Sequence, residues 1–140
     1  MILTDGDTNT LEYTRKNIKR NCANQCGEET ITTSKIVCHQ LIWGPMFAET
    51  FRSEHGTFDT IMGSDIIYVE QVLEPLWITV ATLLSKPNGR FLLAFARRNV
   101  QMDLVLEHAK KVGLQLSDKA PPPSDDEGVF VFEWLANAAC

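Results

Sequence analysis

The sequence predicts an α/β fold with a mostly parallel β-sheet, formed by one domain over residues 1–140. Short apolar runs alternate along the chain with longer stretches of helical periodicity, which is the pattern of strands connected by helices. The run "RFLLAFARR", residues 90–98, is nearly continuously apolar, as expected of a strand covered on both faces. The run "GVFVFEWLA", residues 128–136, is rich in β-branched and aromatic residues and predicts a closing strand.

Strand and helix signals alternate from the start of the chain. "MILTDG" begins apolar and stops at an acid and a glycine, which predicts a short strand. Residues 8–24 carry Leu11, Thr14, Ile18 and Cys22 at helical spacing with basic residues on the other face, and either Thr8 or Thr10 is expected to cap this helix. A second strand is expected in residues 34–44, followed by a short helix or a loop in residues 46–56.

The second half continues the alternation. "TFDTIMGSDIIY", residues 57–68, predicts a third strand. A long apolar helix is expected in residues 69–89, where Pro75 marks the first turn or a kink and "KPNG" stops the helix. After the strand at residues 90–98, an amphipathic helix is expected to end at Gly113, and a weak strand follows in residues 114–119.

Composition and charge exclude several classes of protein. The net charge of −5 argues against nucleic acid as a partner, because phosphate binding normally needs a basic face. No apolar run approaches the ~20 residues that span a bilayer, and "MILTDGDTNT" turns polar too early for a signal peptide. The four cysteines and three histidines lack the spacing of a zinc site, so no metal is expected. Free thiols favour a reducing compartment, the cytoplasm or the nucleus.

Ligands of parallel α/β sheets bind beyond the carboxyl ends of the strands. Side chains predicted to stand at such ends are therefore the candidate site residues: Asp5, Trp43, Asp65 with Tyr68, and Arg97 with Arg98. A carboxylate at Asp5 can accept hydrogen bonds from a ribose diol; the alternative is a turn or capping aspartate in "DGD". The indole of Trp43 can stack on a purine or cover a cofactor; the alternative is a core tryptophan.

The third predicted strand ends in an unusual combination of residues. Gly63 and Ser64 are small and let a ligand approach the backbone closely. The carboxylate of Asp65 can accept a hydrogen bond from an amine, and Tyr68 offers a hydroxyl and a ring face. Together they could hold a lysine side chain in line for attack, with its nitrogen reacting as the neutral amine. In the alternative, Asp65 caps the next helix and Tyr68 packs on its first turn.

With these residues in view, the chain resembles the class I methyltransferases that use S-adenosylmethionine, and within them the family-16 protein methyltransferases. That group includes lysine methyltransferases acting on calmodulin, chaperones and elongation factors. Three stretches carry the resemblance: "LTDGD", "LIWG" and "FDTIMGSDIIY", the last with the Asp-x-x-Tyr signature at residues 65–68. The resemblance implies a Rossmann-like fold with an antiparallel closing strand. It also implies that Asp5 binds the cofactor ribose, that Trp43 and Ser64 line the same cleft, and that Asp65 and Tyr68 orient the substrate amine.

One departure from the family pattern concerns the glycine-rich loop that receives the methionine part of the cofactor. The eight glycines include no G-x-G cluster, and the match begins at what would be the second strand of the family. In the family's order, the first strand lies between the second and the fourth. Without it, two strands would present open edges, so the chain is expected to be the C-terminal part of a longer enzyme. The alternative is a short protein that pairs the second and fourth strands directly or borrows a strand from a partner.

These features predict an S-adenosylmethionine-dependent methyltransferase acting on lysine side chains of a protein, inactive or weakly active as the 140-residue chain. Its protein substrate is not identified by the sequence. One rival is a non-catalytic Rossmann-like binding module. Another is a fragment of an NAD-dependent oxidoreductase, because an acid after the second strand also serves that cofactor.

Overall fold

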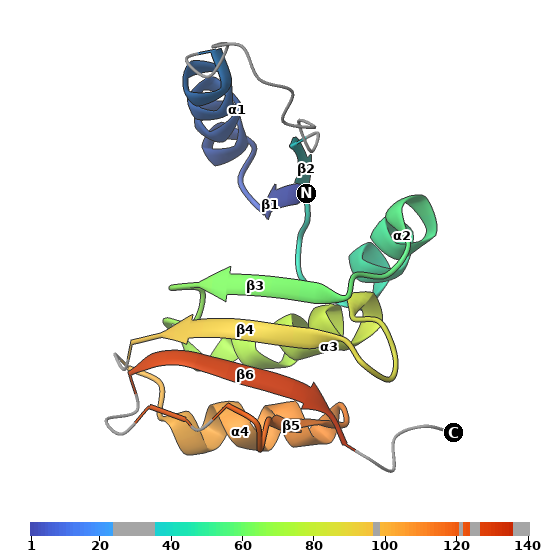
Figure 1. The fold of residues 1–140 in the computed structure, drawn as a ribbon, viewed down its shortest axis with the longest axis vertical. Coiled ribbons are helices and arrows are strands. Elements are labelled where there is room, and N and C mark those ends of the chain that lie inside the picture. The colour runs from blue at the N-terminus through green and yellow to red at the C-terminus, as the bar shows by residue number, and fades with distance from the viewer. Residues whose placement is uncertain (24–35, 97–98, 121, 124–126, 136–140) are drawn as a thin grey trace. The chain divides into compact units, whose positions relative to one another are not determined.

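The computed structural model describes residues 1–23, 36–96, 99–120, 122–123 and 127–135 (Figure 1). The chain divides into two compact units, Met1–Ile42 and Trp43–Cys140, and each is described by itself. A single domain over residues 1–140 stays a prediction.

The first unit is a strand–helix–strand motif. Strand β1 (Ile2–Asp5) pairs in parallel with β2 (Val37–Gln40), and helix α1 (Thr8–Ala23) follows β1. The carboxylate of Asp7 caps α1, because its Oδ1 accepts a hydrogen bond of 2.8 Å from the backbone N–H of Asn9. The expectation of a threonine cap was therefore wrong by one position or more.

The second unit contains a four-stranded sheet in the order β3-β4-β6-β5. Its elements, in chain order, are α2 (Pro45–His55), β3 (Thr60–Ser64), the 3₁₀ turn η1 (Glu70–Val72), α3 (Leu73–Leu83), β4 (Arg90–Phe95), α4 (Met102–Lys111), β5 (Leu114–Leu116) and β6 (Gly128–Trp134). Strand β3 is parallel to β4, whereas β6 is antiparallel to both of its neighbours. The predicted fold class, an α/β sheet that is mostly parallel with an antiparallel closing strand, is confirmed.

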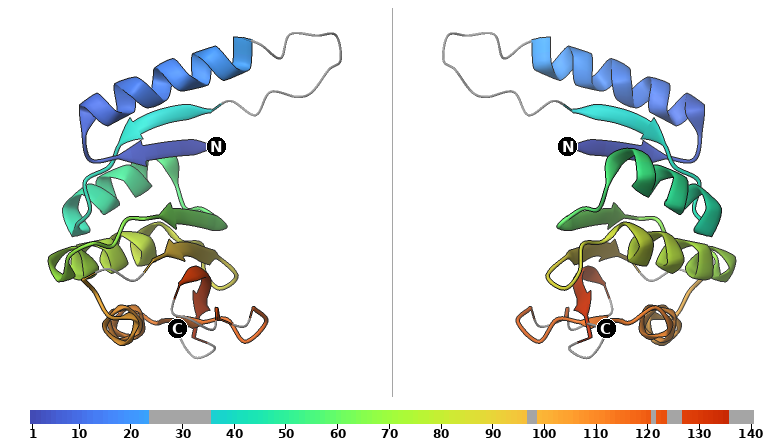
Figure 2. Two further views of the ribbon diagram at one scale, coloured as in Figure 1. Left: turned by 90° about the vertical axis from the view of Figure 1, so that its left-hand side faces the viewer. Right: turned by 90° about the vertical axis from the view of Figure 1, so that its right-hand side faces the viewer.

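Helices α3 and α4 lie on one face of this sheet, as the two side views show (Figure 2). Alternate residues of β4 and β6 are buried on that face, which is the expected signature of a sheet packed on one side. The indole of Trp77 on α3 sits edge-on to Phe91 of β4 and to Phe132 of β6, with ring centroids 5.5 and 4.8 Å apart. This aromatic cluster is the centre of the core.

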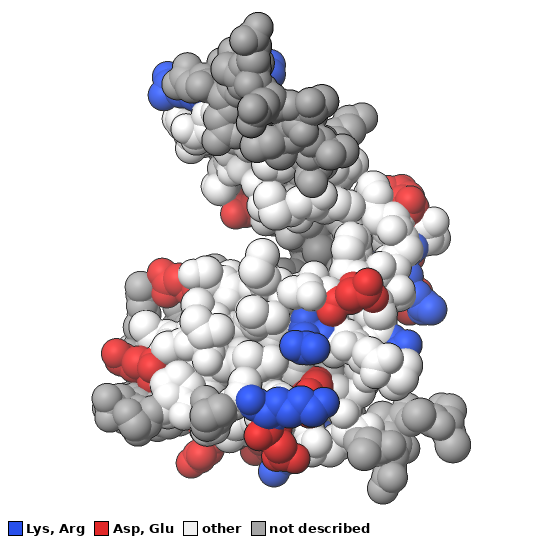
Figure 3. Space-filling view, in the orientation of Figure 1, with Lys and Arg blue, Asp and Glu red and all other residues white. Residues whose placement is uncertain are grey.

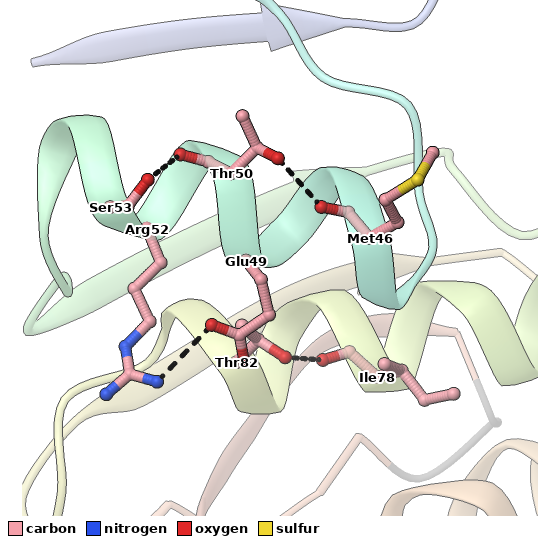
Figure 4. A network of polar contacts seen from close by, with 7 residues as sticks. All are labelled: Met46, Glu49, Thr50, Arg52, Ser53, Ile78 and Thr82. Atoms are coloured by element: carbon pink, nitrogen blue, oxygen red, sulfur yellow. Dashed lines mark hydrogen bonds and ion pairs between the residues drawn. The ribbon is translucent and has the colours of Figure 1, made fainter.

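Helix α2 runs beside α3 and carries local polar contacts on its outer surface (Figure 4). The hydroxyl of Thr50 donates to the carbonyl of Met46, and that of Ser53 to the carbonyl of Thr50. The segment that the sequence left open between helix and loop is thus a helix. Proline at its first position explains the start, since that position needs no N–H donor.

Two strand ends differ from the sequence-based expectation. Strand β2 ends at Gln40, so Trp43 lies in the connection to α2 and not at the end of a strand. Strand β3 ends at Ser64, and residues 65–69 form an irregular segment before η1. Each apolar run was longer than its strand because residues such as Leu41 and Ile67 bury their side chains from irregular backbone.

The first strand of each sheet has a single partner strand. Among the described residues, β1 pairs with β2 alone and β3 pairs with β4 alone. Each of these strands therefore has one edge that no described strand occupies, as the sequence analysis expected for them.

Candidate functional site

Asp5 lies at the carboxyl end of β1 and shapes the turn into α1. Its Oδ1 accepts a hydrogen bond of 2.8 Å from the backbone N–H of Asp7. The turn interpretation of "DGD" is thus observed. This hydrogen bond occupies only part of the acceptor capacity of Asp5, because an ionised carboxylate offers about four acceptor positions. Ribose hydroxyls remain chemically compatible with Asp5.

Trp43 is the first residue of the second unit. It is partly buried and packs against the hydrophobic core of that unit. The next residue, Gly44, donates its backbone N–H to the hydroxyl of Thr79 over 2.9 Å. Core packing, the alternative interpretation of Trp43, is therefore observed in part. The residue is not fully buried, so part of its surface is accessible to solvent.

The chain turns sharply where β3 ends. Ser64 is the last residue paired with β4, opposite Ala94, and its side chain is exposed. Asp65 follows with a left-handed backbone, φ 54°, and donates its N–H to the carbonyl of Ala94 over 3.1 Å. Aspartate is among the residues that tolerate this conformation, at a modest cost. The turn leaves the Asp65 side chain exposed at the rim of the sheet.

Two isoleucines anchor the segment that carries the candidate pair. Ile67 is 3% exposed and belongs to the core, and Ile66 packs partly against it. Asp65 and Tyr68, on either side of them, are exposed, Tyr68 by 51%. The packing of Ile66 and Ile67 thus fixes the middle of this irregular segment, and the carboxylate of Asp65 and the phenol of Tyr68 are exposed to solvent.

Asp65 is not the N-cap residue of either helix that follows it. The N-cap residues of η1 and α3 are Val69 and Val72, and neither makes a side-chain cap hydrogen bond. Tyr68 is 51% exposed, so about half of this residue faces solvent.

The structure gives a reason for a glycine at position 63 that the sequence analysis missed. A Cβ atom there would collide with Cδ1 of Ile66 and lie 3.4 Å from the ring of Phe91. The missing side chain makes room for Ile66 and so supports the anchored segment. The sequence spacing of a glycine three residues before an apolar side chain does not reveal such a contact.

The two remaining candidate residues, Arg97 and Arg98, lie outside the described residues. On the face drawn in Figure 3, acidic and basic side chains of the second unit are interspersed. Within the described ranges, no group of three or more His, Cys, Asp or Glu residues could hold a metal ion. Nor does any helix in those ranges have the length and apolar character needed to cross a membrane.

Comparison with known proteins places this geometry in a family. No curated protein matches the chain. Among solved structures, a methyltransferase from Pyrococcus furiosus aligns with a TM-score of 0.59 at 19% identity, over 94% of this chain and 61% of that one. The similarity shows a shared fold, and the chain spans less than two thirds of that relative. Residues 1–112 match the lysine methyltransferase family Methyltransf_16. The chain belongs to this lysine methyltransferase family.

Proposed function

We propose that the chain acts as an S-adenosylmethionine-dependent protein-lysine N-methyltransferase in which Asp65 and Tyr68 orient the substrate amine. The observation that carries the proposal is the anchored segment 65–69, which presents Asp65 and Tyr68 to solvent at the end of β3. Membership of the lysine methyltransferase family supports the reaction class. A protein substrate that offers a lysine side chain follows from the same proposal.

Asp5 of the first unit and Trp43 of the second each have a side chain whose chemistry suits one part of the cofactor. Asp5 keeps acceptor capacity for ribose hydroxyls, and the partly exposed Trp43 offers an indole for the adenine or the sulfonium region. When bound, S-adenosylmethionine supplies an electrophilic methyl group on its sulfonium. Ser64 is proposed to border this site. That Asp5, Trp43 and Ser64 line one cleft stays a prediction.

The role of Asp65 and Tyr68 follows from the needs of methyl transfer. The attacking lysine nitrogen must be neutral, correctly oriented and in line with the bond that breaks, so positioning contributes more than acid–base chemistry. The Asp65 carboxylate accepts a hydrogen bond from the amine, and the Tyr68 ring and hydroxyl confine it from the other side. The proton released from the methylated amine passes to solvent.

We expect the 140-residue chain to bind S-adenosylmethionine weakly, with a dissociation constant well above the micromolar range. The reason is that its glycines form no G-x-G loop whose backbone N–H groups would receive the methionine part. Isothermal titration calorimetry of the purified chain measures this directly. Micromolar affinity without any added chain would show that the loop is dispensable and that this account of the site is wrong.

The proposed function is tested by methyl transfer. The chain, joined to a strand and glycine-rich loop from a family member, is incubated with labelled S-adenosylmethionine and protein from a cell extract. Label should appear as methyl-lysine after hydrolysis of the protein. Cofactor binding without transfer to any amino acid would favour the non-catalytic module. Binding of NAD in place of S-adenosylmethionine would favour the oxidoreductase fragment.

A further inference from the structure

A buried hydroxyl on α3 bridges two segments that are far apart in the sequence. Thr79 is 3% exposed, and its Oγ1 accepts the backbone N–H of Gly44 over 2.9 Å. The same hydroxyl donates to the carbonyl of Pro75, one turn earlier on the helix, over 2.8 Å. The hydroxyl of Thr79 thus both donates and accepts a hydrogen bond. The two bonds fix its rotamer and hold the Gly44 N–H in one direction.

The partner of this hydroxyl is a turn with little freedom of its own. Gly44 has a φ of 141°, a conformation that favours glycine, and it is the N-cap residue of α2. Its carbonyl accepts the N–H of Ala48, while Pro45 restricts the following position. The N–H that Thr79 holds belongs to the peptide group joining Trp43 to Gly44.

We propose that Thr79 is a positioning residue for Trp43. By fixing the peptide group next to Trp43, the hydroxyl sets the direction in which the partly buried indole leaves the backbone. Without this contact, the Gly44 N–H would be buried and unsatisfied, and the turn would rotate to find another acceptor. The consequence for cofactor binding rests on the proposed function, whereas the effect on the turn does not.

Thr82 provides a matched control on the same helix. Its hydroxyl donates to the carbonyl of Ile78 over 2.8 Å (Figure 4). Thr79 makes the same local contact with Pro75. Within the described ranges, Thr82 accepts no hydrogen bond from Gly44 or from another distant N–H. Replacing either threonine by valine keeps the β-branched shape, so the two variants differ in the link to Gly44.

The first measurement is amide hydrogen exchange by NMR in the purified chain. Exchange of the Gly44 amide should be about ten- to a hundredfold faster in Thr79→Val than in wild type, since a buried acceptor is lost. Thr82→Val should leave it unchanged, and Thr79→Ser should restore most of the protection. The Leu84 amide, bonded to Val80 on the same helix, serves as an internal reference for global opening. If Thr79→Val does not fold, Thr79→Ala supplies the same test.

The second measurement separates this inference from the proposed function. The resonance of the Trp43 indole should shift or broaden in Thr79→Val and not in Thr82→Val, and the affinity for S-adenosylhomocysteine in an NMR titration should fall severalfold. The positioning role would be overturned if Gly44 exchange stayed unchanged in both Thr79→Val and Thr79→Ala. It would also be overturned if Thr82→Val changed that exchange as much as Thr79→Val does. If Trp43→Ala leaves that affinity unchanged while Gly44 exchange responds to Thr79, the cofactor role of Trp43 fails and the positioning role stands.

Discussion

The substitution Trp77→Ala is expected to lower the free energy of unfolding by about 3–5 kcal/mol. Trp77 is 0% exposed and contacts the rings of Phe91 and Phe132 edge-on, so truncation removes both aromatic contacts and leaves a cavity. A whole domain is typically stable by about 5–15 kcal/mol, so much of the second unit's stability depends on this ring. Urea unfolding followed by circular dichroism measures the change.

The matched control for Trp77→Ala is Met62→Ala. Met62 is 70% exposed in the middle of β3, so its truncation should change stability by no more than about 0.5 kcal/mol. A loss below about 1 kcal/mol for Trp77→Ala would mean that the cluster is not the centre of the core.

Trp77→Phe is expected to cost clearly less than Trp77→Ala. The Nε1 atom of Trp77 is buried and has no hydrogen-bond partner in the described part of the chain. Phenylalanine keeps an aromatic ring between Phe91 and Phe132 and removes that unsatisfied N–H, which offsets part of the lost volume. Equal losses for the two variants would show that the indole N–H has a partner that contributes to stability.

The second large effect is expected in catalysis. Asp65→Asn should slow methyl transfer by about ten- to a hundredfold, because a charge-assisted hydrogen bond to the substrate amine is worth about 1.5–3 kcal/mol. Asparagine also tolerates the left-handed backbone that residue 65 adopts, so the fold of the turn should persist. The measurement is the rate of transfer to lysine by the chain joined to a family glycine-rich loop, at saturating cofactor.

Three further measurements interpret the Asp65→Asn result. Cofactor affinity should change little, since Asp5 and Trp43 are untouched. Asp59→Asn makes the same chemical change in the residue before β3, where the carboxylate accepts a hydrogen bond from Ser85, and should leave the transfer rate near wild type. Tyr68→Phe keeps the ring and should cost less than Asp65→Asn. Transfer at the wild-type rate by Asp65→Asn would make the pair a structural feature.

Periodicity in the sequence was sufficient to predict the alternation of strands and helices. The apolar run at β4 and the amphipathic pattern at α4 are local signals, and both elements formed where those signals lie. The antiparallel closing strand and the family membership are likewise confirmed. Local sequence encodes these features because backbone conformation and the burial of one face repeat with a fixed period.

The ends of elements were harder to predict. Trp43 does not end β2, and Asp7 rather than a threonine caps α1. In residues 58–68, Gly63, Ser64 and Asp65 mark the end of the strand, but the sequence does not show that the apolar Ile66 and Ile67 after them lie in an irregular segment. Only packing distinguishes a strand residue from a loop residue that fills the same core.

The sequence by itself determined the fold class, the family and the presence of an aspartate and a tyrosine three positions apart after β3. The tertiary structure decided that Ile66 and Ile67 anchor the segment between them, that Gly63 makes room for Ile66, and that Thr79 holds the turn after Trp43. Those contacts join residues by shape and by single hydrogen bonds, one of them across 35 positions of the chain. No local periodicity encodes them, because they exist only once the elements of the second unit have packed together.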